Sequence, residues 1–207
     1  MSADGMIAAK TLAYTLCSPL DTLRQNKLVG LDLTVKKVMR GMGFAMGGGF
    51  MLSGACHKTI EIGEAFAVPS ILSVVLGVIA MNVIKTPIVY NYRRVQTGLS
   101  PVLLIPKSRV KSLFTVNIIE DIVEETVKYS LVRYRTKTRD TNSLFWDSII
   151  LFSIGYPFDV MKNGTIYNKK INGSLFDFGA RCVHKNAQNL VFFKTLACLH
   201  TEKQTQL

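Results

Sequence analysis

Acidic and basic side chains that follow a proline at the end of an apolar segment are the residues best placed for chemistry. In the stretch SPLDTLRQNK, Asp21 and Arg24 come two and five residues after Pro19. In YPFDVMKNG, Asp159 and Lys162 hold the same two places after the proline. A carboxylate among apolar neighbours is costly unless a cation pairs with it. The pattern therefore predicts ion pairs, with partners supplied from elsewhere in the chain.

The same proline site occurs a third time between these two. The stretch TPIVYNYRRVQTG keeps Pro87 and a base at Arg94, and its proline lies 68 residues after Pro19 and 70 residues before Pro157. Each site stands toward the end of an apolar segment and precedes a basic loop, and a second apolar segment follows. A recurring period indicates one structural unit per repeat. We expect a single domain of three two-helix units, at about 1–64, 65–139 and 140–207.

The composition indicates a membrane protein with basic flanks. Of the 207 residues 48% are hydrophobic, yet the net charge is +11 and the pI is about 9.6. Residues 65–84 form an uncharged run that is long enough to cross a bilayer. The five other apolar segments carry charges, as spans do when they turn a polar face into a bundle. The sequence therefore predicts an all-α membrane protein with six transmembrane helices.

Two other classes of function fit single features of the sequence. The basic composition and the mixed aromatic and basic residues of KTPIVYNYRRVQ are typical of nucleic-acid binding, but the uncharged run before this stretch argues against it. The chain has no P-loop, G-x-G-x-x-G, G-x-S-x-G or H-E-x-x-H motif, and its four cysteines form no C-x-x-C pair. We therefore expect neither a nucleic-acid partner nor an enzyme, and we assign no catalytic residue.

The threefold repeat of a helix ending in P-x-D-x-x-K/R, a loop and a second helix resembles the mitochondrial carrier family. The stretches MRGMGFAMGGGF and GARCVHKNAQNLVFF are similar to the second helices of that family's repeats. The resemblance covers essentially the whole chain. It implies six tilted transmembrane helices in three pseudo-repeats around a pseudo-threefold axis. It also implies a multi-pass protein of the mitochondrial inner membrane, with both termini facing the intermembrane space.

The resemblance further implies a ring of ion pairs that closes the bundle toward the mitochondrial matrix. In that family the acid after each proline pairs with the base of a neighbouring repeat, so Asp159 is expected to pair with Arg24. The second repeat has Val89 and Tyr92 where its acid and base should stand, which leaves one of the three expected pairs. The residues assigned to the motif are Pro19, Asp21, Arg24, Pro87, Arg94, Pro157, Asp159 and Lys162.

A pair of glycines in the second apolar segment predicts close helix packing. Gly43 and Gly47 form a small-xxx-small pattern, which lets two helix backbones approach each other. Packing against the first helix is the simpler interpretation, and contact with another protein is the alternative.

Four charged residues outside the motif are candidates for contacts with lipid headgroups or partner subunits. Arg93 and Lys169 lie in basic stretches that suit anionic headgroups such as cardiolipin. Glu120 and Glu124 share one helical side, and we expect them to meet bases of other helices or of a partner. Acids at this spacing also bind metals in helical bundles, but no E-x-x-H accompanies them, so we predict no metal site.

Two hypotheses for the function follow. The first is a structural, supernumerary subunit of a larger inner-membrane complex, either a respiratory-chain complex or the ATP synthase, that transports nothing. Its partners would be the other subunits and membrane lipids, with no cofactor beyond a bound phospholipid such as cardiolipin. The second is a divergent carrier that exchanges a small anionic metabolite across the inner membrane. The loss of acid and base from the second repeat favours the first hypothesis.

Overall fold

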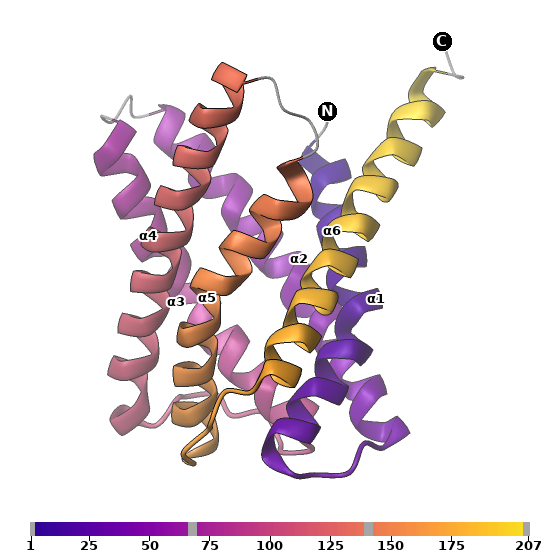
Figure 1. The fold of residues 1–207 in the computed structure, drawn as a ribbon, viewed down its shortest axis with the longest axis vertical. Coiled ribbons are helices and arrows are strands. Elements are labelled where there is room, and N and C mark those ends of the chain that lie inside the picture. Colours follow the sequence, from indigo (N-terminus) through magenta and orange to yellow (C-terminus); the bar gives the residue numbers. More distant parts are fainter. Residues whose placement is uncertain (1–2, 66–69, 139–142, 205–207) are drawn as a thin grey trace.

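The computed structural model describes residues 3–65, 70–138 and 143–204, which form the bundle of six α-helices shown in Figure 1. The helices expected from the sequence are therefore present, two in each third of the chain. They are α1 (Ala3–Val29), α2 (Val35–Ala65), α3 (Ser70–Gln96), α4 (Lys107–Thr138), α5 (Ser143–Tyr167) and α6 (Leu175–Gln204).

The helices form a closed ring. Each helix packs against its neighbour in the chain, and α6 packs against α1. Helix α3 also contacts α1 and α5 across the ring. In Figure 1 both termini lie at one end of the bundle, and the connections 30–34, 97–106 and 168–174 lie at the other. The residues that follow the three prolines are thus carried toward one end, which we call the loop end.

Helices α1, α3 and α5 continue through their prolines. They end ten residues after Pro19, nine residues after Pro87 and ten residues after Pro157. A proline inside a helix removes a backbone hydrogen bond and crowds the preceding turn, but it does not oblige the helix to stop there. Because the chain remains helical, an acid and a base three residues apart lie on the same side of one turn.

Capping residues fix where the helices end and begin at the loop end. Gly30 follows α1 with a φ of 72°, and Gly98 lies just beyond α3 with a φ of 90°, a left-handed conformation that glycine adopts without strain. Thr34 Oγ1 accepts a backbone hydrogen bond from the first turn of α2, and Ser174 Oγ does so for α6. These caps set the start of each second helix of a pair.

The expectation of transmembrane helices is wrong for the residues that the structure describes. None of the helices in this part of the chain is both long and apolar enough to cross a membrane. The uncharged part of α3 runs from Ser70 to Ile84 and ends at Lys85, and residues 66–69 of the predicted run lie outside the described residues. Charges that lie inside the bundle interrupt the apolar stretches. The six-helix prediction holds, but the transmembrane carrier-type interpretation does not.

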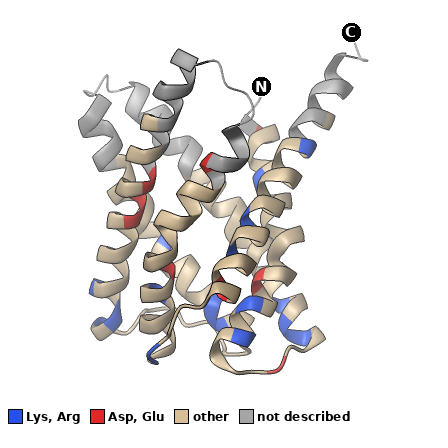
Figure 2. Cartoon of the chain, viewed as in Figure 1, with Lys and Arg blue, Asp and Glu red and all other residues tan. Residues whose placement is uncertain are grey.

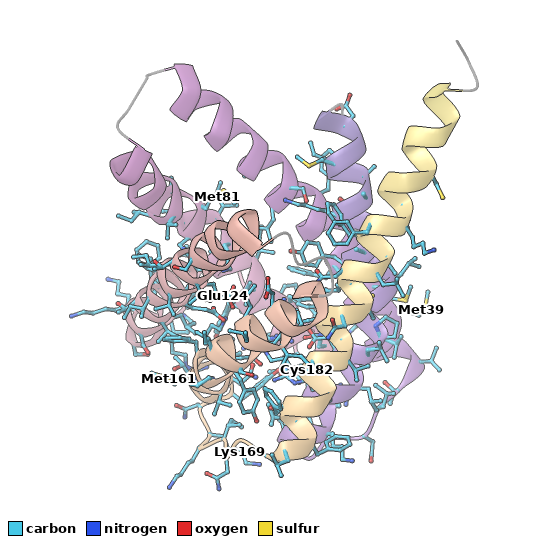
Figure 3. The ribbon with its side chains drawn as sticks, turned by 45° about the horizontal axis from the view of Figure 1, so that its top comes forward. Met39, Met81, Glu124, Met161, Lys169 and Cys182 are labelled. Atoms are coloured by element: carbon cyan, nitrogen blue, oxygen red, sulfur yellow. The ribbon has the colours of Figure 1, made fainter. Side chains whose placement is uncertain are left out.

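The ring has a polar interior, and much of its outer surface is apolar. The one apolar cluster of fully buried side chains among the described residues is small, with Tyr90, Leu113 and Ile166 at its centre. Large apolar side chains instead face outward, and Figure 3 shows Met39 and Met161 at the periphery with Glu124 between the helices. The largest fully buried side chains include Gln25, Asn26, Asn82, Gln96, Asn117 and Asn163.

The glycines that pack α2 against its neighbours are not the ones expected from the sequence. Gly43 and Gly47 are exposed, and no described atom outside their own helix turn lies within 4 Å of a Cβ built there. A Cβ on Gly41 would lie 2.7 Å from Thr22 Oγ1 of α1, and one on Gly49 would lie 3.4 Å from the Thr11 Cα. The small-xxx-small pattern that packs against α1 is therefore Gly41, Ala45 and Gly49, two residues away from the predicted register.

Alanine at Gly41 and alanine at Gly43 should have opposite effects on stability. Gly43→Ala should raise the free energy of unfolding by up to about 1 kcal/mol, because alanine is the better helix former and the site is open. Gly41→Ala should lower it by about 1–3 kcal/mol, because the new methyl group meets the buried Thr22 hydroxyl. Chemical denaturation of the two variants measures the difference, and equal stabilisation by both would contradict the packing described here.

Candidate functional site: an interior ion-pair network

Charged side chains from five helices meet inside the ring. Figure 2 shows acidic and basic positions on neighbouring helices between the middle of the bundle and its loop end. We call this set the interior network. Its bases are Arg24, Lys85, Arg93, Lys162, Arg181 and Lys185, and its acids are Asp21, Glu120, Asp121, Glu124, Asp159 and Asp177.

Arg24 of α1 lies at the centre of the network and is 4% exposed. Its Nη2 pairs with Asp159 Oδ2 of α5, which is the pair expected from the sequence. Its Nε donates a hydrogen bond to Asp177 Oδ1 of α6 at 2.7 Å, and its Nη2 lies 3.2 Å from Asp177 Oδ2. One planar guanidinium therefore joins three helices, and two of its partners come from outside its own.

Arg93 supplies the base that the second repeat was expected to lack. Its Nη1 pairs with Asp21 Oδ2, and its Nη2 lies 3.5 Å from Asp159 Oδ1. Gln96 Nε2 donates a second hydrogen bond to Asp21 Oδ2 at 3.0 Å. Tyr92, at the position of the expected base, donates instead to Ser18 Oγ at 2.9 Å. Arg93 thus belongs to the interior network, and its contact with a lipid headgroup stays a prediction.

Arg94, assigned to the motif from the sequence, lies outside the network. Its Nε donates to the Ser100 carbonyl oxygen at 3.0 Å, and its guanidinium lies over the Tyr90 ring. The base of the second repeat is therefore one residue earlier than expected. Adjacent positions on a helix point about 100° apart, so a shift of one residue decides which arginine faces inward.

Lys162 finds its acid on α4 instead of in the second repeat's proline motif. Its Nζ pairs with Glu120 Oε2, and Arg181 Nη2 of α6 lies 3.7 Å from Glu120 Oε1. Arg181 Nε also lies 3.7 Å from Asp159 Oδ2. The expectation that Glu120 meets bases of other helices is confirmed.

The other expected contact residues separate into interior and exposed positions. Asp121, next to Glu120, pairs with Lys85 Nζ and accepts a hydrogen bond from Asn82 Nδ2 at 2.8 Å. Glu124 points into the ring and lines its cavities. Lys169 is exposed in the connection between α5 and α6. Of the four predicted headgroup or partner contacts, only Lys169 lies on the surface.

Burial and the neighbouring charges shift the pKa values of the buried acids and arginines in opposite directions. Burial by itself raises the pKa of Asp21 and Asp159, but the arginines beside them outweigh it and hold both values below their usual range. Burial likewise lowers the pKa of Arg24 and Arg93, and the facing carboxylates raise both above the ordinary arginine value. These four groups therefore stay charged, and the pairs act as fixed contacts between helices.

His184 is a neutral member of the same region. Its Nδ1 lies 3.9 Å from Asp21 Oδ1, and its Nε2 is buried without a hydrogen-bond partner among the described residues. Burial lowers its pKa to about 4, although the charge of Asp21 acts in the opposite direction. The imidazole is therefore uncharged near neutral pH.

Two adjoining cavities lie inside the ring. A cavity of about 190 Å³ has most of the network in its wall, and a cavity of about 370 Å³ lies between α1, α5 and α6. Gly155 makes room for the charges between them, because a Cβ there would collide with Glu124 Oε1 and lie 2.9 Å from Arg181 Nη2. No group of three His, Cys, Asp or Glu residues in the described ranges is arranged to hold a metal ion.

Sequence reasoning missed Lys85, Asp121, Asp177, Arg181 and Lys185, and it assigned Arg93 to a headgroup or partner contact instead of to the network. Asp177 and Arg181 lie four residues apart near the start of the last segment, and that spacing was a signal that the two charges share one side of a helix. Arg93 stands beside the expected position, where only the helix rotation distinguishes it from its neighbours.

Comparison with known proteins adds no further assignment. No protein-family model, curated protein or solved structure gives a significant match to this chain.

Replacing Arg24 should cost far more stability than replacing Arg94. Arg24→Ala leaves two buried carboxylates without their main partner, so the free energy of unfolding should fall by about 3–5 kcal/mol. Arg94→Ala removes one hydrogen bond to a loop carbonyl and should cost about 1 kcal/mol or less. Urea denaturation of both variants checks this, and similar losses in the two would remove Arg24 from the centre of the network.

Stability should fall as the pH is lowered from about 6.5 to about 4. His184 has a pKa of about 4 when folded, so the unfolded chain binds more protons in this window and acid favours unfolding. The loss should reach about 3 kcal/mol from this group. Asp21 and Asp159, whose pKa values are lowered, add their loss at more acidic pH.

Denaturation curves at several pH values compare the protein with His184→Gln. The glutamine variant should show a flatter dependence between pH 6.5 and 4. A variant curve parallel to that of the unchanged protein would show that His184 titrates normally when folded.

Proposed function

We propose that the chain is a structural subunit of a larger protein assembly and that it transports no solute. The observation that carries this proposal is the row of large apolar side chains on the outside of α1. Leu12, Leu16, Leu20 and Leu23 recur every three or four residues, and each is more than 40% exposed. A helix that presents such a face to its surroundings is suited to pack against an apolar surface of another protein.

The two helices that pack against α1 also expose large apolar side chains. On α2, Met39, Met46 and Phe50 are exposed, and on α6, Val183 and Leu190 are exposed. Both helices pack directly against α1. Exposed apolar area of this extent, on three adjacent helices, is typical of proteins that bury the surface in a stable complex.

The interior favours a structural role over the binding of an anionic solute. The network contains six bases and six acids, so its charges balance when His184 is neutral. A site for an anionic metabolite needs cations that are not already paired, and five of the six bases have a carboxylate oxygen of the chain within 4 Å.

The resemblance noted in the sequence suggests which assembly to test. A respiratory-chain complex or the ATP synthase of the mitochondrial inner membrane is the proposed host. A phospholipid such as cardiolipin is the proposed bound lipid, with exposed Lys169 as a candidate contact for its phosphates. These identities rest on the resemblance alone.

Native gel electrophoresis after mild extraction tests the proposal. The chain should migrate with a large complex at fixed stoichiometry, far above its own 23.0 kDa. Leu16→Arg, on the apolar face and 52% exposed, should release it, because a charge would be buried at the interface. Leu103→Arg is the matched control, since Leu103 is 94% exposed but lies in the connection between α3 and α4. Migration of the unchanged chain alone would contradict the proposal, as would equal release by both substitutions.

A further inference from the structure

Lys185 differs from every other base of the interior network. The other five bases each have a carboxylate oxygen within 4 Å, whereas the Lys185 Nζ makes no ion pair or hydrogen bond with a described residue. Lys185 lines both cavities and is half-buried. Its amine is therefore an accessible group that the stabilising contacts of the bundle do not use.

The surroundings of Lys185 disfavour its charged form. Burial is the largest cause and the charge of Arg181, one turn earlier on α6, is the next, and together they lower the pKa to about 8. The carboxylates act in the opposite direction without restoring the ordinary value. The charged or titratable groups that line the two cavities with it are Arg181 and His184 on α6, Glu120 and Glu124 on α4, Asp159 and Lys162 on α5, Lys85, Tyr92 and Arg93 on α3, and Lys10, Tyr14, Asp21 and Arg24 on α1.

The cavity beside Lys185 has the lining of a small-molecule site. Its volume is about 370 Å³, and its walls combine the rings of Tyr14, Phe152 and Phe192 and the side chain of Leu151 with polar and charged side chains, which are Lys10, Glu124, Arg181, Gln188 and Asn189. Small-molecule sites are concave and combine apolar and aromatic walls with polar groups that orient the ligand. These walls suit a small aromatic or branched molecule whose reactive group reaches the amine.

We propose that Lys185 is a nucleophilic site that binds small aromatic or branched carbonyl compounds as a covalent imine. In this step the lone pair of the neutral Nζ attacks the carbonyl carbon, which forms a C–N bond and gives a carbinolamine. The C–O bond then breaks, and the oxygen leaves as water with the two protons that were on the amine. No oxidant or reductant takes part, and the product is a neutral imine that water can hydrolyse. The site lies inside the ring and does not depend on the proposed assembly.

Reductive trapping with benzaldehyde tests this site on the full-length protein. The protein is incubated with benzaldehyde and cyanoborohydride at pH 8, and peptide mass spectrometry locates and times each benzyl group. Lys185 should be labelled at least about tenfold faster than a lysine of ordinary pKa, because about half of its amines are uncharged at this pH. Exposed Lys36 and Lys169 are the internal references.

Two controls separate the folded site from general lysine reactivity. In denaturant the advantage of Lys185 should disappear, since its burial is lost. Phe192→Ala, which removes one wall of the cavity, should slow the labelling of Lys185 and leave Lys36 and Lys169 unchanged. Labelling of folded Lys185 at the rate of the exposed lysines, or preferential labelling of Lys10 in the same cavity, would overturn the proposal.

Discussion

The contact of the Arg24 guanidinium with Asp159 and Asp177 is the constraint on which the rest of the bundle depends. A buried arginine stays protonated at any pH at which the protein is folded. The helices around it must therefore supply carboxylates to pair with its charge. Here they come from α5 and α6, which lie far from α1 in the sequence. The contact therefore determines how three helices are rotated, and it helps to close the ring between the first and last units.

The remaining charges also form ion pairs that join one helix of the ring to another. Arg93 joins α3 to Asp21 of α1, and Lys162 joins α5 to Glu120 of α4. Each pair crosses a boundary between helices, and each places a base against an acid of another helix. Removing one member of such a pair leaves a buried charge, which is costly, whereas the intact pair adds less to stability than its short contacts suggest. The network therefore specifies how the helices are arranged around the ring, and it is not the main source of the bundle's stability.

The distribution of apolar residues follows from this interior. Because amides and charges fill the ring, only a small apolar cluster at α3, α4 and α5 is left inside, and the leucines of α1 face outward. The outer surface therefore exposes apolar area that a partner protein could bury. The same arrangement places one amine, that of Lys185, beside apolar walls and away from any direct carboxylate contact.

The sequence was informative where short-range patterns decide the outcome. The recurring prolines indicated the six helices in their order. The rule that a buried acid needs a base predicted ion pairs, and the family resemblance implied that Asp159 pairs with Arg24. The sequence was not sufficient where the rotation of a helix about its axis determines which residue faces a neighbour. Arg93 faces inward in place of Arg94, and Gly41 packs against α1 in place of Gly43. The transmembrane interpretation failed because apolar content was counted per segment, whereas none of the described helices is both long and apolar enough to cross a membrane.

A double-mutant cycle between Arg24 and Asp177 tests the central claim most directly. The single and double alanine variants are compared by the free energy of unfolding. If the guanidinium joins α1 to α6, the two substitutions should be coupled by about 1–3 kcal/mol. Losses that add to within about 0.5 kcal/mol would show that the two residues act independently, and the interior network would then not hold the ring together.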